Sequence, residues 1–440
     1  MAVQNRRARM HPASILAAAT LGCAACSEPA TRPHVLLVSI DTLRADHLSC
    51  YGYARETSPF LDQLARRGIL FERAFSSAPW TLPAHLTMLT GLFPAQHGVV
   101  EEELALARDV PLLAERLSAA GYATLGLYRP SWIHARHGFA RGFDVFRGHE
   151  TVEEARAHAL EELAKLDPAR PTFLFLHLFD VHNGALAEGE HMLYASPPPY
   201  QDLFLPGAAE LLPEIPPDVL WEGENLLDAR GKEAIAALYD GGIRHVDANL
   251  AELFGELERD GWLTNALVLV TSDHGESLAQ RGKLTGHGEL AQEGLHVPLI
   301  VVRPDGTRAG ERVRELVHLG DIVPTVLAAA GLGADARLPG RSLFGELAPG
   351  RVASGTYLPN EFAVRWPEKL IHRRGGSTVA FDLERDPLEL APRAVKSERY
   401  EELLRAAHPA GSPFGPPTAI SLTAEDAEDL RALGYGGEDE

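Results

Sequence analysis

Apolar runs without polar alternation recur along the chain, and stretches with apolar residues at helical spacing separate them. The runs predict buried strands at residues 34–40, 122–128, 171–180, 265–272 and 297–302. The amphipathic stretches predict helices at residues 59–68, 112–120, 152–166 and 233–259. Apolar strands that alternate with helices are typical of a mostly parallel sheet covered on both faces. We therefore expect an α/β fold in which helices sandwich a mostly parallel central sheet.

Two segments depart from this alternation. Residues 184–232 are rich in Pro and Gly and lack a clean period. We interpret them as an insertion, which either covers the active-site edge and helps to choose the substrate or is a surface loop without a role. Beyond about residue 345 the pattern becomes shorter and more β-like before a helical stretch at 396–407. The sequence thus predicts a catalytic domain over 34–345 and a smaller C-terminal α+β subdomain over 346–440.

The N-terminus resembles an export signal. Three arginines in the first nine residues precede an Ala-rich stretch at 13–22, which is too short to span a bilayer. Cys23 follows Gly22 and resembles the acylated cysteine of a bacterial lipoprotein; Cys26 is an alternative, and so is a plain secretory peptide with incidental cysteines. We expect residues 1–23 to be the signal and 24–33 a tether. The mature protein would then be a periplasmic or outer-membrane lipoprotein, held to the membrane by its lipid.

The overall charge narrows the class of partner. The formal net charge is -20 at pH 7, and no basic patch stands out. Proteins that bind nucleic acid usually carry such a patch, so nucleic acid is not an expected partner. An acidic chain would also repel an anionic substrate unless a metal ion locally reversed the field. Only Cys50 follows Cys26, which excludes an internal disulfide framework and a thiolate metal site.

Carboxylates end two of the predicted strands. The run at 34–40 ends at Asp41, and the run at 265–272 ends at Asp273, which His274 follows. The carboxyl ends of parallel strands meet at one edge of a sheet, where such folds carry their chemistry. We therefore expect these side chains to form one divalent-metal site.

Thr81 is the candidate nucleophile. Pro83 suits the first turn of a helix, which would put Thr81 at a helix N-terminus where the dipole favours an anion. A hydroxyl becomes a good nucleophile when a metal stabilises its deprotonated form. The alternative is an ordinary helix N-cap. Together with the metal site, Thr81 predicts an enzyme that attacks a tetrahedral anion, a phosphate or sulfate ester.

A series of motifs, in this order along the chain, resembles the sulfatase family of the alkaline phosphatase superfamily. They lie at residues 38–52, 81–98, 176–182, 272–276, 287–299, 381–387 and 430–435. The resemblance implies that family's fold and an ester-bond hydrolase. It also implies that Asp41, Asp273, His274 and the Thr81 oxygen are the metal ligands.

The chain departs from the family pattern at several of these positions. Thr81 stands where family members carry the Cys or Ser that is converted to formylglycine, and His85 stands where they carry an arginine. Oxidation of threonine would give a ketone rather than an aldehyde, which puts the formylglycine mechanism in doubt. Thr42 replaces an aspartate, His274 often an asparagine and His287 a lysine. Imidazole ligands favour Zn or Mn, with Ca or Mg as alternatives.

A second group comprises Asp180, His182 and His287. These residues would hold a second metal ion, or His182 and His287 would bind the substrate's oxygens, so one or two ions are expected. We expect His85 to help to neutralise the substrate's oxygens near the nucleophile, with packing or capping as the alternative. We interpret His177 as a strand residue packed in the core.

The predicted function is metal-dependent hydrolysis of a small anionic ester, a phosphate or a sulfate, through Thr81. A threonine nucleophile also resembles the nucleotide pyrophosphatases and phosphoethanolamine transferases of the superfamily, which favours phosphate. One alternative is a phosphoethanolamine-type transferase, in which a lipid or sugar hydroxyl replaces water. Another is a non-catalytic binding lipoprotein with the same fold.

Overall fold

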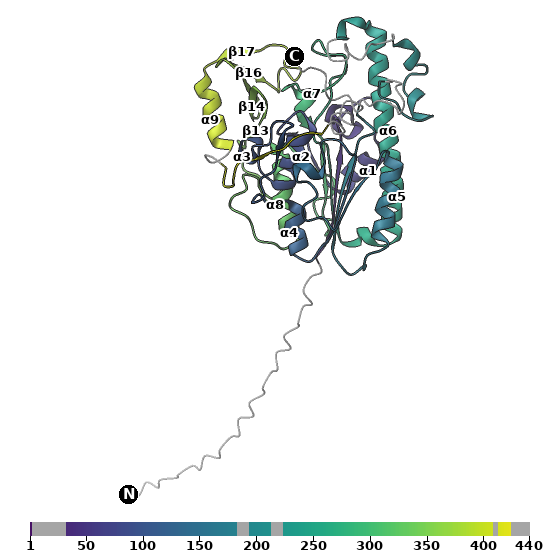
Figure 1. The fold of residues 1–440 in the computed structure, drawn as a ribbon, viewed down its shortest axis with the longest axis vertical. Helices are drawn as coiled ribbons and strands as arrows, with labels where there is room; N and C mark the ends of the chain where they lie inside the picture. Colours follow the sequence, from purple (N-terminus) through teal and green to yellow (C-terminus); the bar gives the residue numbers. More distant parts are fainter. Residues whose placement is uncertain (2–31, 183–192, 213–222, 408–411, 424–440) are drawn as a thin grey trace. The chain divides into compact units, whose positions relative to one another are not determined.

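The computed structural model describes Met1 and residues 32–182, 193–212, 223–407 and 412–423 (Figure 1). The two candidate acylation sites, Cys23 and Cys26, lie outside the described residues, as does the motif at 430–435. Among the helices of the described part, none is both long and apolar enough to cross a bilayer.

An eight-stranded sheet with the order β11-β2-β10-β8-β1-β7-β5-β6 forms the centre of the fold. Its strands are β1 (His34–Ile40), β2 (Ile69–Phe71), β5 (Ala123–Tyr128), β6 (Val145–Gly148), β7 (Thr172–Leu178), β8 (Ala266–Thr271), β10 (Leu299–Val302) and β11 (Glu311–Val313). Every neighbouring pair is parallel except the two pairs that include β10. The mostly parallel sheet predicted from the apolar runs is confirmed.

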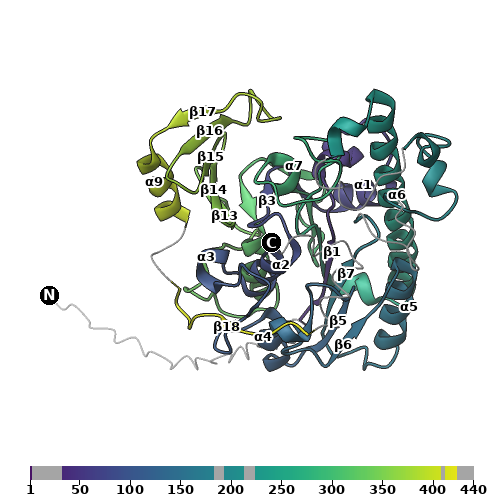
Figure 2. The same ribbon diagram turned by 45° about the horizontal axis from the view of Figure 1, so that its top comes forward.

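Helices cover both faces of this sheet, as Figures 1 and 2 show. One face packs against α2 (Thr81–Thr90), α4 (Leu113–Ala119) and α8 (Ile322–Ala329), and the other against α1 (Pro59–Arg67), α5 (Val152–Leu163) and α6 (Ala229–Arg259). Alternate residues of β1 enter the two cores, since successive side chains of a strand point to opposite faces. Val35 and Leu37 belong to the first core, and Leu36 and Val38 to the second. The helix sandwich is therefore also confirmed.

The C-terminal region forms a second, antiparallel sheet in the same compact unit. Its strands are β13 (Ala353–Tyr357), β14 (Asn360–Arg365), β15 (Glu368–His372), β16 (Thr378–Asp382) and β17 (Arg393–Val395). One face packs against α9 (Ser397–Ala407) through Tyr400 and Leu403, and the other packs against Phe75 and Leu295 of the catalytic region. A smaller C-terminal α+β subdomain is thus present, with an apolar core shared with its neighbour.

Two boundaries differ from the predicted ones for simple physical reasons. The strand predicted at 297–302 is divided at Pro298, which has no N–H to donate to a ladder, into β9 (His296–Val297) and β10. Helix α6 begins at Ala229, because the Asp228 side chain accepts hydrogen bonds from the first free N–H groups. The last residues of the predicted insertion therefore belong to α6.

Candidate metal centre and nucleophile

Two neighbouring strand ends deliver the predicted metal ligands to one place. Asp41 follows β1 directly, and Asp273 and His274 follow β8, whose residue Thr271 pairs with Ser39. All three ligands are fully buried, and their ligand atoms lie within 4.8 Å of one another. The parallel register of the strands thus brings together residues that are more than 200 positions apart in the sequence.

Thr81 adds a hydroxyl to this group. It is the first residue of α2, which follows an extended Trp80 and has Pro83 in its first turn. Its Oγ1 lies 3.5 Å from Asp41 Oδ2 and 3.4 Å from His274 Nε2. The structure therefore places the predicted nucleophile at a helix N-terminus and beside the predicted metal ligands.

The spacing of the donor atoms suits a divalent ion. His274 Nε2 lies 3.3 Å from Asp273 Oδ2 and 3.7 Å from Asp41 Oδ1. Two ligands held at about 2.0–2.1 Å by one tetrahedral ion lie roughly 3.3 Å apart. Asp41 Oδ1 and Asp273 Oδ2 are also buried without a hydrogen-bond partner among the described residues. A buried carboxylate oxygen in that condition is costly, so both oxygens favour a cation between them.

The tautomer of His274 strengthens this assignment. Its Nδ1 lies 2.9 Å from the Gly275 carbonyl oxygen. Because a carbonyl oxygen only accepts, Nδ1 carries a proton, and Nε2 is the ring nitrogen left to face a ligand. Nε2 lies 3.3 Å from Asp273 Oδ2, so an ion bound between the two atoms would have one nitrogen and one oxygen ligand. An imidazole nitrogen and carboxylate oxygens are ligands that Zn and Mn accept readily.

The two carboxylates of the site differ electrostatically. Burial and the adjacent Asp273 raise the pKa of Asp41 well above its usual value. Burial also opposes ionisation of Asp273, yet its neighbour His274, through its ring and its backbone N–H, lowers the pKa of Asp273. Two carboxylates in a dry site repel each other, and a bound divalent cation would relieve that repulsion.

Both ring nitrogens of His85 face hydrogen-bond partners inside the protein. Its Nε2 lies 3.0 Å from Ser39 Oγ and its Nδ1 lies 3.0 Å from the Thr81 carbonyl oxygen. Burial lowers its pKa to about 3, so the ring is neutral. The predicted role, neutralising the substrate's oxygens, does not fit these contacts, because both ring nitrogens already face partners in the protein.

His177 contacts one of the candidate metal ligands. The sequence analysis predicted only a strand residue packed in the core and did not predict this contact. Its ring is fully buried on β7, but its Nε2 lies 3.1 Å from Asp41 Oδ2. The period of the strand could have revealed it: Phe173 and Phe175 pack on the face that carries α2, and His177 is the next residue on that face. It also pairs in register with Ser39, two residues before Asp41.

The predicted second group is divided. The rings of His182 and His287 lie 5.7 Å apart, and the His287 ring lies 4.6 Å from that of His274. Burial lowers the pKa of His287 well below its usual value, which keeps the ring neutral. Asp180 instead accepts a hydrogen bond of 3.1 Å from Val152 N at the start of α5. Its carboxylate therefore stabilises a helix end and is in neither described group of potential metal ligands.

A family model described as Sulfatase matches residues 33–332. The chain belongs to the sulfatase family. Among curated proteins it is 23% identical to an arylsulfatase of Clostridium perfringens, over 84% of this chain and 92% of that one. It is 25% identical to the multifunctional alkaline phosphatase superfamily protein PehA of Trinickia caryophylli, over 76% of this chain and 81% of that protein.

A solved structure, the phosphonate monoester hydrolase of Agrobacterium radiobacter, shares the fold with a TM-score of 0.69. It is 20% identical and covers 89% of this chain and all of that one. These comparisons confirm the predicted resemblance, the alkaline phosphatase-like fold and an ester-bond hydrolase. Sulfatase-family proteins generally depend on a metal, and Asp41, Asp273 and His274 could hold one here.

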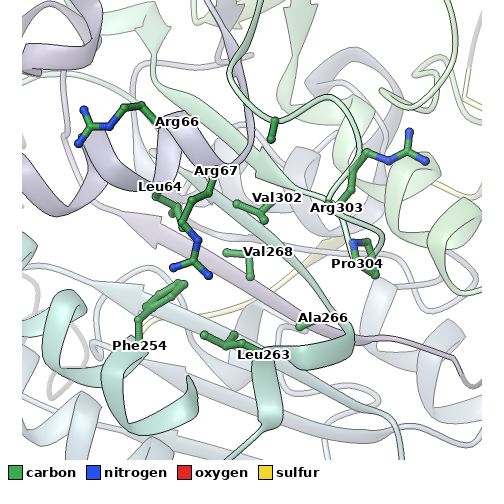
Figure 3. Close-up of a pocket in the computed structure, with 12 residues that line it drawn as sticks. Leu64, Arg66, Arg67, Phe254, Leu263, Ala266, Val268, Val302, Arg303 and Pro304 are labelled. Carbon is green, nitrogen blue, oxygen red and sulfur yellow. The ribbon is translucent and has the colours of Figure 1, made fainter. Parts of the chain in front are cut away.

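Figure 3 shows a cavity elsewhere in the fold, which the candidate metal ligands do not line. That cavity, of about 390 Å³, lies at the opposite end of β8. It is lined by Leu64, Arg66, Arg67, Phe254, Leu263, Ala266, Val268, Val302, Arg303, Pro304, Gly306 and Ala309. No carboxylate or imidazole is among these lining residues, so the cavity lacks the groups that ester hydrolysis needs.

Proposed function

We propose that this sulfatase-family protein is a metal-dependent hydrolase that uses the Thr81 hydroxyl as its nucleophile. The observation that carries the proposal is the buried group of Asp41, Asp273 and His274, with Thr81 Oγ1 3.4 Å from His274 Nε2. A divalent ion held by Asp41, Asp273 and His274 would supply the positive charge that favours a deprotonated hydroxyl and a developing anion. Zn and Mn are the favoured ions, and Ca and Mg the alternatives.

The reaction then proceeds in two displacements. The Thr81 hydroxyl gives up its proton as Oγ attacks the central atom of the ester in line. The bond from Oγ to the central atom forms, and the bond to the leaving alcohol breaks as that oxygen takes up a proton. Water next attacks the same central atom, which restores the Thr81 hydroxyl and releases the anion. His182 and His287 lie beside the ligands and would donate ring N–H groups to the non-reacting oxygens. The N-terminus of the ten-residue helix α2 favours the same negative charge.

The threonine also favours phosphorus over sulfur as the central atom. Thr81 lacks the primary carbon that an aldehyde needs, so the aldehyde-hydrate route for releasing sulfate is closed. A threonine phosphoester can be hydrolysed directly by water, whereas a threonine sulfoester lacks that easy route. We expect phosphate or phosphonate esters to react at least about tenfold faster than sulfate esters, which is about 1.4 kcal/mol of barrier.

One comparison of substrates tests this preference. The purified protein is stripped of metal, reloaded with Zn, Mn, Ca or Mg, and assayed with 4-nitrophenyl esters of sulfate, phosphate, phosphate diester and phenylphosphonate. A higher kcat/KM for the sulfate would contradict the phosphorus preference while leaving the fold and the nucleophile intact. No turnover of any ester by any reloaded form would instead favour the non-catalytic alternative.

We also propose export, with acylation at Cys23 or Cys26. The support is the basic start, the short Ala-rich stretch and the small residue before each cysteine. As a separate proposal, the catalytic domain spans 34–345 and the C-terminal subdomain spans 346–440. Intact-mass measurement of protein purified from membranes should show one lipid-modified cysteine, and an unmodified mass for both would disprove the acylation.

A further inference from the structure

Two buried imidazoles lie behind the proposed metal ligands, one beside each carboxylate. We propose that His85 and His177 are positioning residues that set the nucleophile and the two carboxylates in the geometry the ion needs. This inference rests on the proposed function, because it presupposes an ion at Asp41, Asp273 and His274. It gives roles to a histidine expected to bind substrate and to a histidine expected only to fill the core.

His85 connects the nucleophile's helix to β1. The Thr81 carbonyl oxygen can only accept, so the proton of the neutral ring lies on Nδ1. Nε2 then has a lone pair and accepts the hydroxyl proton of Ser39, 3.0 Å away and two residues before Asp41. Nδ1 also lies 3.4 Å from Asp273 Oδ2. One ring therefore relates the first turn of α2 to both metal-bearing strands.

His177 orients the other carboxylate. Its Nε2 lies 3.1 Å from Asp41 Oδ2. Because a carboxylate oxygen accepts, Nε2 carries a proton and donates a hydrogen bond to Asp41 Oδ2. The second oxygen, Asp41 Oδ1, remains without a hydrogen-bond partner in the described part of the chain and lies 3.7 Å from His274 Nε2. The hydrogen bond thus decides which oxygen of Asp41 faces the ion.

The two rings also fix each other. Their centroids are 4.8 Å apart with the planes at 90°, and both side chains are fully buried. Edge-to-face contact of this kind is favourable for aromatic rings and leaves little room for either to rotate. Outer partners of this kind hold metal ligands in place, and their loss typically costs about 10–100-fold in metal affinity.

A second ion is the rival explanation of the same cluster. His85, His177 and Asp273 have ligand atoms within 4.8 Å of one another, which is close enough to hold an ion. For Nδ1 of His85 to bind it, that nitrogen would have to lose its proton. Its lone pair would then face the Thr81 carbonyl oxygen at 3.0 Å, which is repulsive. The hydrogen-bonded arrangement avoids this conflict.

The experiment measures Zn²⁺ affinity and stoichiometry by chelator competition on the full chain, with folding checked by thermal unfolding. His85→Leu and His177→Leu should each weaken affinity about 10–100-fold, with one ion per chain in the wild type. His85→Asn and His177→Gln place an N–H near the native donor and should recover most of the loss. The matched control is His97→Leu, a fully buried histidine that contacts Val99 N rather than a metal carboxylate. It should leave the affinity unchanged.

Several results would overturn the inference. These are wild-type affinity in both leucine variants, an equal loss in the control, or two ions per chain of which either variant loses one. If a leucine variant does not fold, the Zn²⁺ affinities of His177→Gln and His177→Asn are compared instead. Only the longer glutamine amide reaches Asp41, so His177→Gln should bind Zn²⁺ more tightly. Equal affinities would contradict the positioning role of His177. Asp273→Ala separates the two proposals: if it binds Zn²⁺ normally, the metal centre itself is wrong.

Discussion

The two ends of β1 and β8 show how one sheet builds two different environments. At the carboxyl ends, Asp41, Asp273 and His274 are fully buried, and two carboxylate oxygens have no hydrogen-bond partner in the described structure. At the amino end of β8, Ala266 and Val268 line a cavity of about 390 Å³ together with other apolar side chains and with arginines (Figure 3). The reactive groups therefore do not line this cavity.

The charges at the two ends differ in how well they are compensated. Near the cavity, Arg67 pairs with Glu258 and Arg303 with Asp305, and both pairs are partly exposed. Such pairs contribute little, because solvent already stabilises each charge. At the metal end two carboxylates face each other out of contact with solvent, which is unfavourable for the free protein. Incomplete compensation of buried charge, rather than cavity volume, marks the proposed metal site.

The strongest test of this difference is Asp273→Ala. It removes a ligand and the carboxylate that His274 Nε2 faces, so we expect loss of bound metal and of at least about 10⁴-fold in kcat, about 5.5 kcal/mol. Metal content by mass spectrometry and turnover of a phosphate ester check this. Glu258→Ala, which removes a carboxylate near the cavity, is the control and should retain both. Full turnover after exhaustive chelation of the wild type would disprove metal dependence.

Thr81 variants come next in size. Thr81→Val keeps the branched shape but removes the hydroxyl, and it should lower kcat by about 10³-fold, or about 4 kcal/mol. Thr81→Ser keeps a hydroxyl at the same helix start and should stay within about tenfold of the wild type. Single-turnover assays with a phosphate ester measure both. Wild-type turnover by the valine variant would show that Thr81 is not the nucleophile.

From the sequence alone, candidate site residues could be placed where their position depends on a single strand or helix. The apolar run of β1 ends at Asp41, that of β8 ends at Asp273, and Pro83 indicated the helix that begins at Thr81. What the sequence could not place depends on neighbours in space. His177 contacts Asp41 only because β7 pairs with β1 in a particular register. Asp180 likewise binds the start of α5, which no local pattern indicates.

Substitutions at the cavity end should change the free energy of unfolding and leave Zn²⁺ affinity and kcat unchanged. Phe254 is almost fully buried and its ring lies 4.9 Å from that of Phe60. Phe254→Ala should lower the free energy of unfolding by about 3 kcal/mol, because a large buried side chain is lost beside an existing hollow. Denaturant unfolding measures this. Zn²⁺ affinity and kcat per folded molecule should stay at wild-type values, and a change in either would show that the two ends are coupled.

The smallest expected effect separates the two ends most directly. Arg67→Met keeps much of the apolar side-chain length but breaks the ion pair with Glu258. The side chains of Arg67 and Glu258 are 54% and 45% exposed. Because solvent screens such a pair, the free energy of unfolding should change by less than about 1 kcal/mol. Salt should shrink even that difference. The variant should hydrolyse a phosphate ester with unchanged kcat and KM, since its charge lies at the end of the sheet opposite to Thr81. A tenfold rise in KM would mean that the substrate reaches this arginine, and the distinction between a reactive end and a structural end would then fail.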